Sequence, residues 1–251
     1  MRWSFLWIFL AISPLIGAEK ILVISIMNSK SVKNFYSPLY IELAQRGHDL
    51  TIISPFKTSD HPKIRDIVGR DLLTGNKDSG DTSNKNYLDD KNVFTQRKEG
   101  KSTLPISMTN FLVDLCREYY SMPEIQDLMA HEKFDIILAF YTFNECGFGM
   151  VHHFQTPFIL LHSNVIIPWN NPTGLPLPYS HVPLPYFPTS DKMSFYERVR
   201  NLVVGNVYGL VDNWYRIPKM EAVYREFLPD APSSDEIARN QNLCQRKFKN
   251  L

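Results

Sequence analysis

Histidine and acidic side chains that stand close together in the sequence are the first candidates for chemistry. His152 and His153 are adjacent, and Asp89 and Asp90 form an acidic pair. A metal site needs converging ligands, but adjacent helical residues point well apart and no third ligand stands at a matching spacing. Asp89 and Asp90 lie in a polar stretch with no strand before it, so we interpret them as a solvated pair. Neither pair predicts a metal site.

A second group of candidates lies between residues 145 and 152. Cys146 and His152 could form a nucleophile pair, but nothing indicates a lowered thiol pKa, and we interpret Cys146 as a buried free thiol. Gly147 and Gly149 resemble a dinucleotide-binding loop, but the third glycine position is His152, so we expect helix packing instead. The odd number of cysteines leaves at least one unpaired and excludes a disulfide scaffold; they are Cys116, Cys146 and Cys244.

The elements that must position any site follow a regular alternation. Short β-branched runs predict buried parallel strands at residues 20–26, 49–54, 133–139 and 156–161. Helical patterns lie between and after them, at 35–46, 108–130 (broken near Pro123), 143–154 and 194–227 (broken near Pro218). Residues 55–101 are polar and read as an exposed loop. The alternation predicts a Rossmann-like, doubly wound parallel α/β sheet.

The N-terminus has the pattern of a cleavable signal peptide. Arg2 precedes an apolar run that is too short to span a bilayer comfortably, and Gly17 and Ala18 end it with small residues. We expect cleavage before Glu19 and delivery to the lumen of the endoplasmic reticulum or secretion. No later stretch is long and apolar enough to cross a membrane. The net charge is +1 and no long basic run stands out, so no nucleic-acid partner is expected.

Four segments together resemble UDP-glycosyltransferases, particularly the insect enzymes. They occur in the family's order and at the family's spacing, and they cover most of the chain after residue 18 except the 55–101 loop. The segments are KILVISIMNSKSVKNFYSPLYIELAQRGHDLTIISPF (20–56), FDIILAFYTFNECGF (134–148), PLPYFPTSDKMSFYERVRN (183–201) and FLPDAPSSDEIARNQNL (227–243).

The resemblance implies the N-terminal, acceptor-binding half of a GT-B glycosyltransferase. Residues 19–243 would form this domain, and residues 244–251 a divergent basic tail. The family transfers a hexosyl group from a UDP-sugar to a small lipophilic acceptor. Its donor-binding domain has no counterpart in the sequence, so the UDP-sugar is expected only with that second domain, and no other cofactor is implied.

The family's chemistry uses a histidine base and a carboxylate that orients it. By the resemblance, the base position falls on Val32 and the carboxylate position on Phe140. Neither side chain can accept a proton, so we expect the chain alone to be inactive. Glu145 is the alternative carboxylate, but without a histidine at the first position it would have nothing to orient.

The acceptor pocket of the family lies at the carboxyl ends of the parallel strands. Residues expected there are mostly apolar with a few polar groups, which suits a small lipophilic ligand: Ser31, Phe35, Tyr36, Phe143, Asn144, His162 and Asn164. Two alternatives to an enzyme stay open at this point. The chain could be a non-catalytic lumenal module that holds lipophilic ligands or associates with intact family members, or an incomplete gene product with no function.

Overall fold

The chain folds around one parallel sheet with helices on both faces. The computed structural model describes residues 17–69, 109–162, 179–184 and 189–239. The sheet contains β1 (Lys20–Ile24), β2 (Asp49–Ser54), β3 (Ile64–Val68), β4 (Ile136–Phe140) and β5 (Phe158–Leu161). Their order is β3-β2-β1-β4-β5, and every pairing is parallel. The doubly wound α/β fold expected from the sequence is therefore confirmed.

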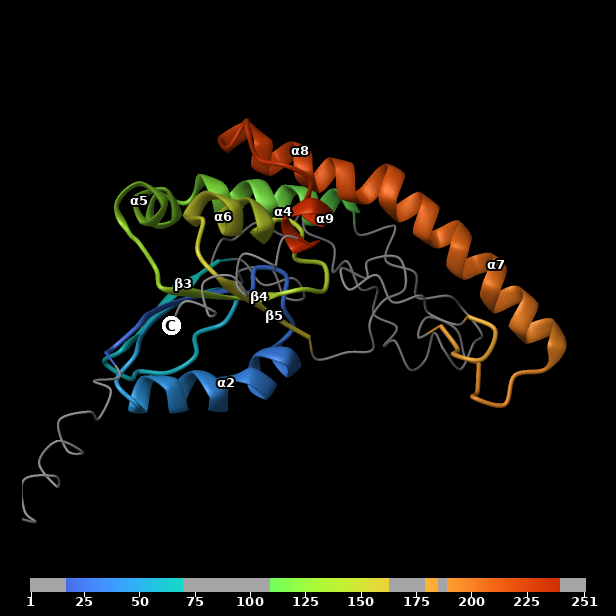
Figure 1. Ribbon diagram of the computed structural model, residues 1–251, viewed down its shortest axis with the longest axis horizontal. Coiled ribbons are helices and arrows are strands. Elements are labelled where there is room, and N and C mark those ends of the chain that lie inside the picture. Colours follow the sequence, from blue (N-terminus) through green and yellow to red (C-terminus); the bar gives the residue numbers. More distant parts are fainter. Residues whose placement is uncertain (1–16, 70–108, 163–178, 185–188, 240–251) are drawn as a thin grey trace, which may run out of the picture.

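Side chains of β1 alternate between the two faces, as the period of two requires. Ile21 and Val23 pack toward α2 (Lys30–Gln45), which among the described helices is the one that covers this face. Leu22 and Ile24 belong to the larger core on the other face. That face is covered by α4 (Thr109–Ser121), α5 (Pro123–His131), α6 (Gly147–Phe154), α8 (Ile217–Phe227) and α9 (Ser234–Arg239) (Figure 1).

The third strand, β3, was not expected, because it lies in the stretch interpreted as a polar loop. Its residues Ile64 and Ile67 are buried, whereas the intervening Arg65 and Asp66 are not. An edge strand needs only a few apolar residues. Because Arg65 and Asp66 separate the two buried isoleucines, the segment lacks the continuous apolar run by which the other strands were predicted. The remainder of the 55–101 loop, from residue 70 on and including Asp89 and Asp90, lies outside the described residues.

The first helix begins earlier than the pattern predicts, at Lys30 rather than at residue 35. Ser29 is its N-cap, and the Ser29 hydroxyl accepts from the backbone N–H of Val32 at 3.5 Å. A serine in this position satisfies one of the donors left free at a helix start. Val32 therefore lies in the first turn of α2 and not in the preceding loop.

The helical stretch 194–227 is not broken near Pro218 as predicted. α7 (Phe195–Val211) continues through a π-helical turn, η3 (Asp212–Arg216), into α8. The backbone N–H of Ile217 bonds to the carbonyl of Asp212, five residues back. Proline cannot donate to the preceding turn and its ring needs space there, so a widened turn before Pro218 lets the chain stay helical.

The cysteine interpretation was wrong for Cys146. Cys116 on α4 and Cys146, which directly precedes α6, form a disulfide, and both are fully buried. The bond joins residues separated by 30 positions. The packing of α4 in the folded chain brings these two residues together, so their spacing in the sequence does not predict the bond.

Candidate functional site

The topological switch point of this sheet lies between β1 and β4, where connections leave in opposite directions. Doubly wound sheets bind ligands at the carboxyl ends of the strands at such a point. Phe140 belongs there to an apolar cluster against which the half-buried Val32 packs, and only 3% of Phe140 is exposed. The rings of Tyr36 and Phe140 stand 6.1 Å apart, edge to face. Val32 and Phe140, the two positions suggested by the family's chemistry, therefore belong to the same apolar neighbourhood at this edge.

The start of α2 forms an exposed rim beside this cluster. The Phe35 side chain is 68% exposed and its ring lies 5.0 Å from the ring of Tyr36. The hydroxyls of Ser31 and Ser29 are 2.8 Å apart. An exposed aromatic ring beside a few hydroxyls offers an apolar contact surface with hydrogen-bonding groups at its border.

A second polar group reaches the same edge from β5. Burial raises the pKa of Tyr36, and a hydrogen bond with the backbone of His162 opposes this shift. His162 Nε2 lies 3.3 Å from the hydroxyl of Thr142, and its ring is 5.7 Å from that of Tyr141. Tyr36 on α2 and His162 after β5 are therefore neighbours at the carboxyl edge. Asn164 lies outside the described residues.

Asn144 lies at this edge but faces the interior. Its side-chain amide donates to the carbonyls of Ile24 and Phe140, at 3.2 and 2.8 Å, and its side-chain oxygen accepts from the N–H of Ile26 at 3.1 Å. Only 1% of the residue is exposed. Asn144 therefore ties the loop after β1 to the loop after β4, and its amide is not presented to a ligand.

Phe143 lies in the same loop with an unusual backbone. The expected helix 143–154 begins only at Gly147, and Phe143 has a positive φ of 56°. Bulky residues rarely adopt this left-handed conformation, which costs roughly 1–3 kcal/mol where the surroundings enforce it. The guanidinium of Arg216 stands 5.3 Å from the centre of the Phe143 ring. Contacts from η3 thus help to hold the ring in place.

Behind this loop lies a buried ion cluster that sequence reasoning did not find. Arg216 donates to both carboxylate oxygens of Glu145, at 2.7 and 2.9 Å, and also to the carboxylate of Asp212. All three side chains are 1–2% exposed. Glu145 is therefore the partner of an arginine and not an acid that faces the site. Residues 145 and 216 are far apart in sequence, and only the structure pairs them.

Arg216 keeps its charge because two carboxylates face it. Burial lowers the pKa of the Arg216 guanidinium, but the adjacent carboxylates of Glu145 and Asp212 outweigh it and hold the pKa well above its usual range. Burial raises the pKa of Asp212, opposed by the hydrogen bond from Arg216. Arg216 therefore stays charged and binds two chain segments together.

The two glycines of α6 serve packing, as expected from the sequence. A Cβ on Gly147 would lie 2.6 Å from the Ile24 side chain, and one on Gly149 would lie 2.9 Å from Cβ of Tyr224. Such distances are too short for real contacts. The helix can approach β1 and α8 this closely only because both positions lack a side chain.

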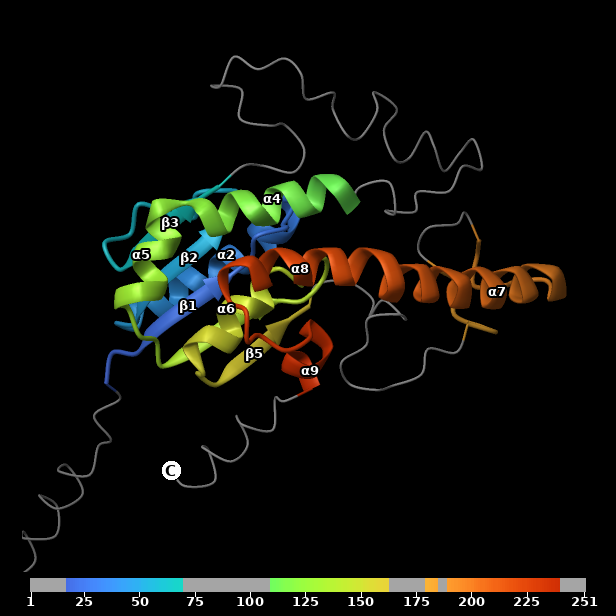
Figure 2. The ribbon, with the colours of Figure 1, turned by 90° about the horizontal axis from the view of Figure 1, so that it is seen from above.

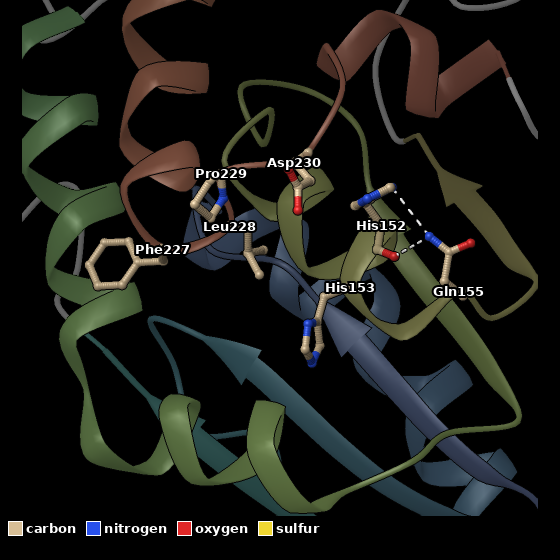
Figure 3. A pocket seen from close by; sticks show the side chains of 8 residues that line it. His152, His153, Gln155, Phe227, Leu228, Pro229 and Asp230 are labelled. Carbon is tan, nitrogen blue, oxygen red and sulfur yellow. Dashed lines mark hydrogen bonds between the residues drawn. The ribbon is translucent and has the colours of Figure 1, made fainter.

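A surface cavity of about 300 Å³ lies at the far end of α6, away from the carboxyl edge (Figure 3). His152, His153 and Gln155 line one side, and residues 227–231 line the other. The Gln155 amide donates to the carbonyl of His152, and His153 Nε2 lies 2.8 Å from the carbonyl of Met129. In the described part of the chain, no group of three or more His, Cys, Asp or Glu residues could hold a metal ion.

These features define an α/β protein with an apolar site at its switch point, and the sequence places it in a family. Residues 19–241 match the family described as UDP-glucoronosyl and UDP-glucosyl transferase. The chain belongs to this family. None of its described helices is long and apolar enough to span a membrane.

Named relatives agree with this assignment. The chain is 29% identical over 201 residues to UDP-glycosyltransferase UGT4 of Dactylopius coccus, covering 77% of this chain and 36% of the relative. It is 31% identical over 211 residues to a putative UDP-glucuronosyltransferase, ugt-46, of Caenorhabditis elegans, covering 78% and 38%. Human UDP-glucuronosyltransferase 2B15 is 26% identical over 208 residues, covering 74% and 37%. The chain thus spans less than half the length of these relatives. No solved structure matches the sequence.

Proposed function

We propose that this chain binds a small lipophilic acceptor with a hydroxyl group at the carboxyl edge of its sheet, as the acceptor-binding part of UDP-sugar hexosyl transfer. The membership of the UDP-glycosyltransferase family supports the reaction class. The observation that carries the binding role is the apolar edge itself, with Phe35 exposed beside Tyr36 and His162. Apolar walls with few polar groups are typical of sites for such ligands.

We further propose that the chain does not activate the acceptor through a histidine–carboxylate pair. Val32 and Phe140 pack in one apolar cluster, and neither has an atom that could take a proton. Loss of a general base typically lowers a rate by about 10²–10⁴-fold. The function that follows is binding without base-catalysed transfer, in the form of a lumenal module for lipophilic ligands.

Binding is tested by thermal unfolding of monodisperse protein with a series of lipophilic phenols. Saturable stabilisation is expected, and Phe35→Ala should weaken it because the ring forms the exposed rim. Leu39→Ala is the matched control, since Leu39 is 41% exposed on the same helix but about 6 Å farther from the sheet edge. Equal loss in both variants, or no stabilisation of the wild type, contradicts the binding site.

Transfer is tested separately, with labelled UDP-glucose, UDP-glucuronate and UDP-galactose and the phenols that bind. No product above a heat-inactivated control is expected. Turnover by the wild-type chain would contradict the absence of base catalysis while leaving the binding site intact. In that case His162→Ala becomes the decisive variant, because among the seven histidines only His162 directly follows a strand.

We also propose that the protein works in the secretory pathway, after removal of residues 1–18. The disulfide between Cys116 and Cys146 supports an oxidising compartment, since such bonds are rare in the cytosol. N-terminal sequencing of the protein made in animal cells should give Glu19 as the first residue. A protein that starts at Met1 contradicts this proposal.

A further inference from the structure

The cavity at the end of α6 is separate from the acceptor edge of the sheet. Its volume of about 300 Å³ lies at the lower end of the range for sites that hold small molecules. At 1.5 Å per residue, the eight residues of α6 place roughly 12 Å of helix between Gly147, beside the switch point, and the cavity (Figures 2 and 3). None of the residues that we expect to bind the acceptor lines it.

Hydrogen bonds within the chain hold both walls of this cavity in place. On the side of the α8–α9 connection, the backbone N–H of Ala231 donates to the carbonyl of Leu228 at 3.1 Å. On the side of α6, Nε2 of His153 lies 2.8 Å from the carbonyl of Met129. A site whose walls are already ordered loses less conformational freedom when a ligand binds.

The same hydrogen bonds determine which polar atoms are left for a ligand. Because a carbonyl can only accept, Nε2 of His153 carries the hydrogen and Nδ1 of the neutral ring is an acceptor. The Gln155 amide nitrogen donates to the carbonyl of His152 at 2.6 Å, which leaves the side-chain oxygen of Gln155 as a second acceptor (Figure 3). The Asp230 carboxylate forms no ion pair with another described residue.

The electrostatic character of the lining selects the charge of the ligand. The eight described residues that line the cavity include one carboxylate, Asp230, and no lysine or arginine. The carboxyl-terminal end of α6 adds a partial negative charge. An anion would therefore be repelled, whereas a group with several N–H donors and a positive charge would be attracted. The other side of the lining is apolar and consists of Phe227, Leu228, Pro229 and Ala231.

We propose that this cavity binds a small organic cation, with a primary ammonium group on an aromatic or aliphatic body. The ammonium group donates hydrogen bonds to Asp230 and to the acceptors at the end of α6. The body packs on Phe227 and Leu228, and the Phe227 ring is held by stacking on Tyr120 with ring centres 5.2 Å apart. The site and its ligand do not depend on acceptor binding at the carboxyl edge.

Isothermal titration calorimetry with 2-phenylethylamine tests the proposal. Phosphate buffer with EDTA is required, because Tris is itself an amine and EDTA removes metal ions. The amine should bind saturably, 2-phenylethanol more weakly, and 3-phenylpropionate not at all. Added salt should weaken binding of the amine, since the ion pair is partly screened. No saturable binding of the amine, or equal binding of all three compounds, overturns the proposal.

Substitution of Asp230 locates the ammonium group. Asp230→Asn should weaken binding of 2-phenylethylamine about fivefold or more, because it removes a charge-assisted hydrogen bond, and Asp230→Lys should abolish binding. Asp114→Asn removes the same charge at a side chain that is 68% exposed on α4, and it should have no effect. All three variants should keep the wild-type circular dichroism. An affinity that Asp230→Asn leaves unchanged overturns the proposal.

One further comparison separates this site from the acceptor edge. Phe35→Ala should leave the affinity for 2-phenylethylamine unchanged, and Asp230→Asn should leave the stabilisation by phenols unchanged. Loss of amine binding in Phe35→Ala would assign the amine to the carboxyl edge and overturn the proposal. Amine binding without any stabilisation by phenols would support the cavity and contradict the acceptor site alone.

Discussion

Two neighbouring regions at the carboxyl edge of this sheet differ in the charge of their side chains: one is apolar and the other contains buried ion pairs. At the switch point, Val32 and Phe140 form an apolar cluster at the two positions where the resemblance suggests a histidine and a carboxylate. In the loop that follows Phe140, Glu145 forms an ion cluster with Arg216 and Asp212 of η3, and these three side chains are only 1–2% exposed.

The difference between the two regions is the number of partners available to each charge. A buried charge is stable only when opposite charges and hydrogen bonds replace the water it has lost. Arg216 donates hydrogen bonds to two carboxylates, and each of these carboxylates has Arg216 as its cationic partner. A histidine or a carboxylate alone at the switch point would have neither. Val32 and Phe140 carry no charge, so their burial has no such penalty.

The largest expected effect comes from breaking the charged region. Arg216→Met keeps much of the side-chain length but leaves Glu145 and Asp212 buried without a cation, and we expect a loss of about 3–5 kcal/mol in the free energy of unfolding. Urea denaturation measures it. Arg46→Met is the control, since its pair with Glu42 is 68% and 54% exposed and should cost less than about 1 kcal/mol. Equal losses of unfolding free energy in the two variants would contradict a stabilising role of the cluster.

The disulfide next to this cluster should have the second largest effect. Replacement of both Cys116 and Cys146 by alanine removes a cross-link over a separation of 30 residues, and we expect a loss of about 2–4 kcal/mol. Thermal and urea unfolding with and without a reductant measure it. The wild type should lose stability on reduction, whereas the double variant should not respond. A wild type that is insensitive to complete reduction contradicts the prediction.

Charges introduced into the apolar region test whether the number of partners decides if a buried charge is stable. Val32→His and Phe140→Asp should each destabilise the chain alone. If the two positions are in contact, the double variant should be more stable than the sum of the single effects by about 0.5–3 kcal/mol. The carboxylate raises the pKa of the folded-state imidazole, so the coupling should be present below about pH 6.5 and be lost as the pH rises through the raised pKa. Val32→His with Leu39→Asp is the control pair and should be additive.

The sequence predicts the architecture well because it depends on local patterns. The apolar runs of β1, β2, β4 and β5 and the packing role of Gly147 and Gly149 could all be inferred. Features that arise from contacts between distant residues could not. The pairing of Cys116 with Cys146 and of Glu145 with Arg216 depends on how α4 and η3 pack against the loop after β4, and the ring of Phe143 lies against the same Arg216.

The smallest effect is expected at Phe143, which links the two regions. Its ring lies beside Arg216, whereas its backbone belongs to the loop that follows Phe140. Phe143→Ala and Phe143→Gly both remove the ring, so they lose the same packing and the same cation–π contact. They differ only in the backbone at φ 56°, which glycine adopts freely and alanine does not.

Glycine is normally less stable than alanine by roughly 0.5–1 kcal/mol, because it loses more conformational freedom on folding. At Phe143 we expect the opposite order, with the glycine variant more stable by about 1 kcal/mol. Urea denaturation of the two variants side by side measures the difference. The same pair of substitutions at Leu39, inside α2, supplies the normal order as a control. If alanine is the more stable residue at both positions, the left-handed backbone of this loop carries no strain, and the ring alone accounts for its position under Arg216.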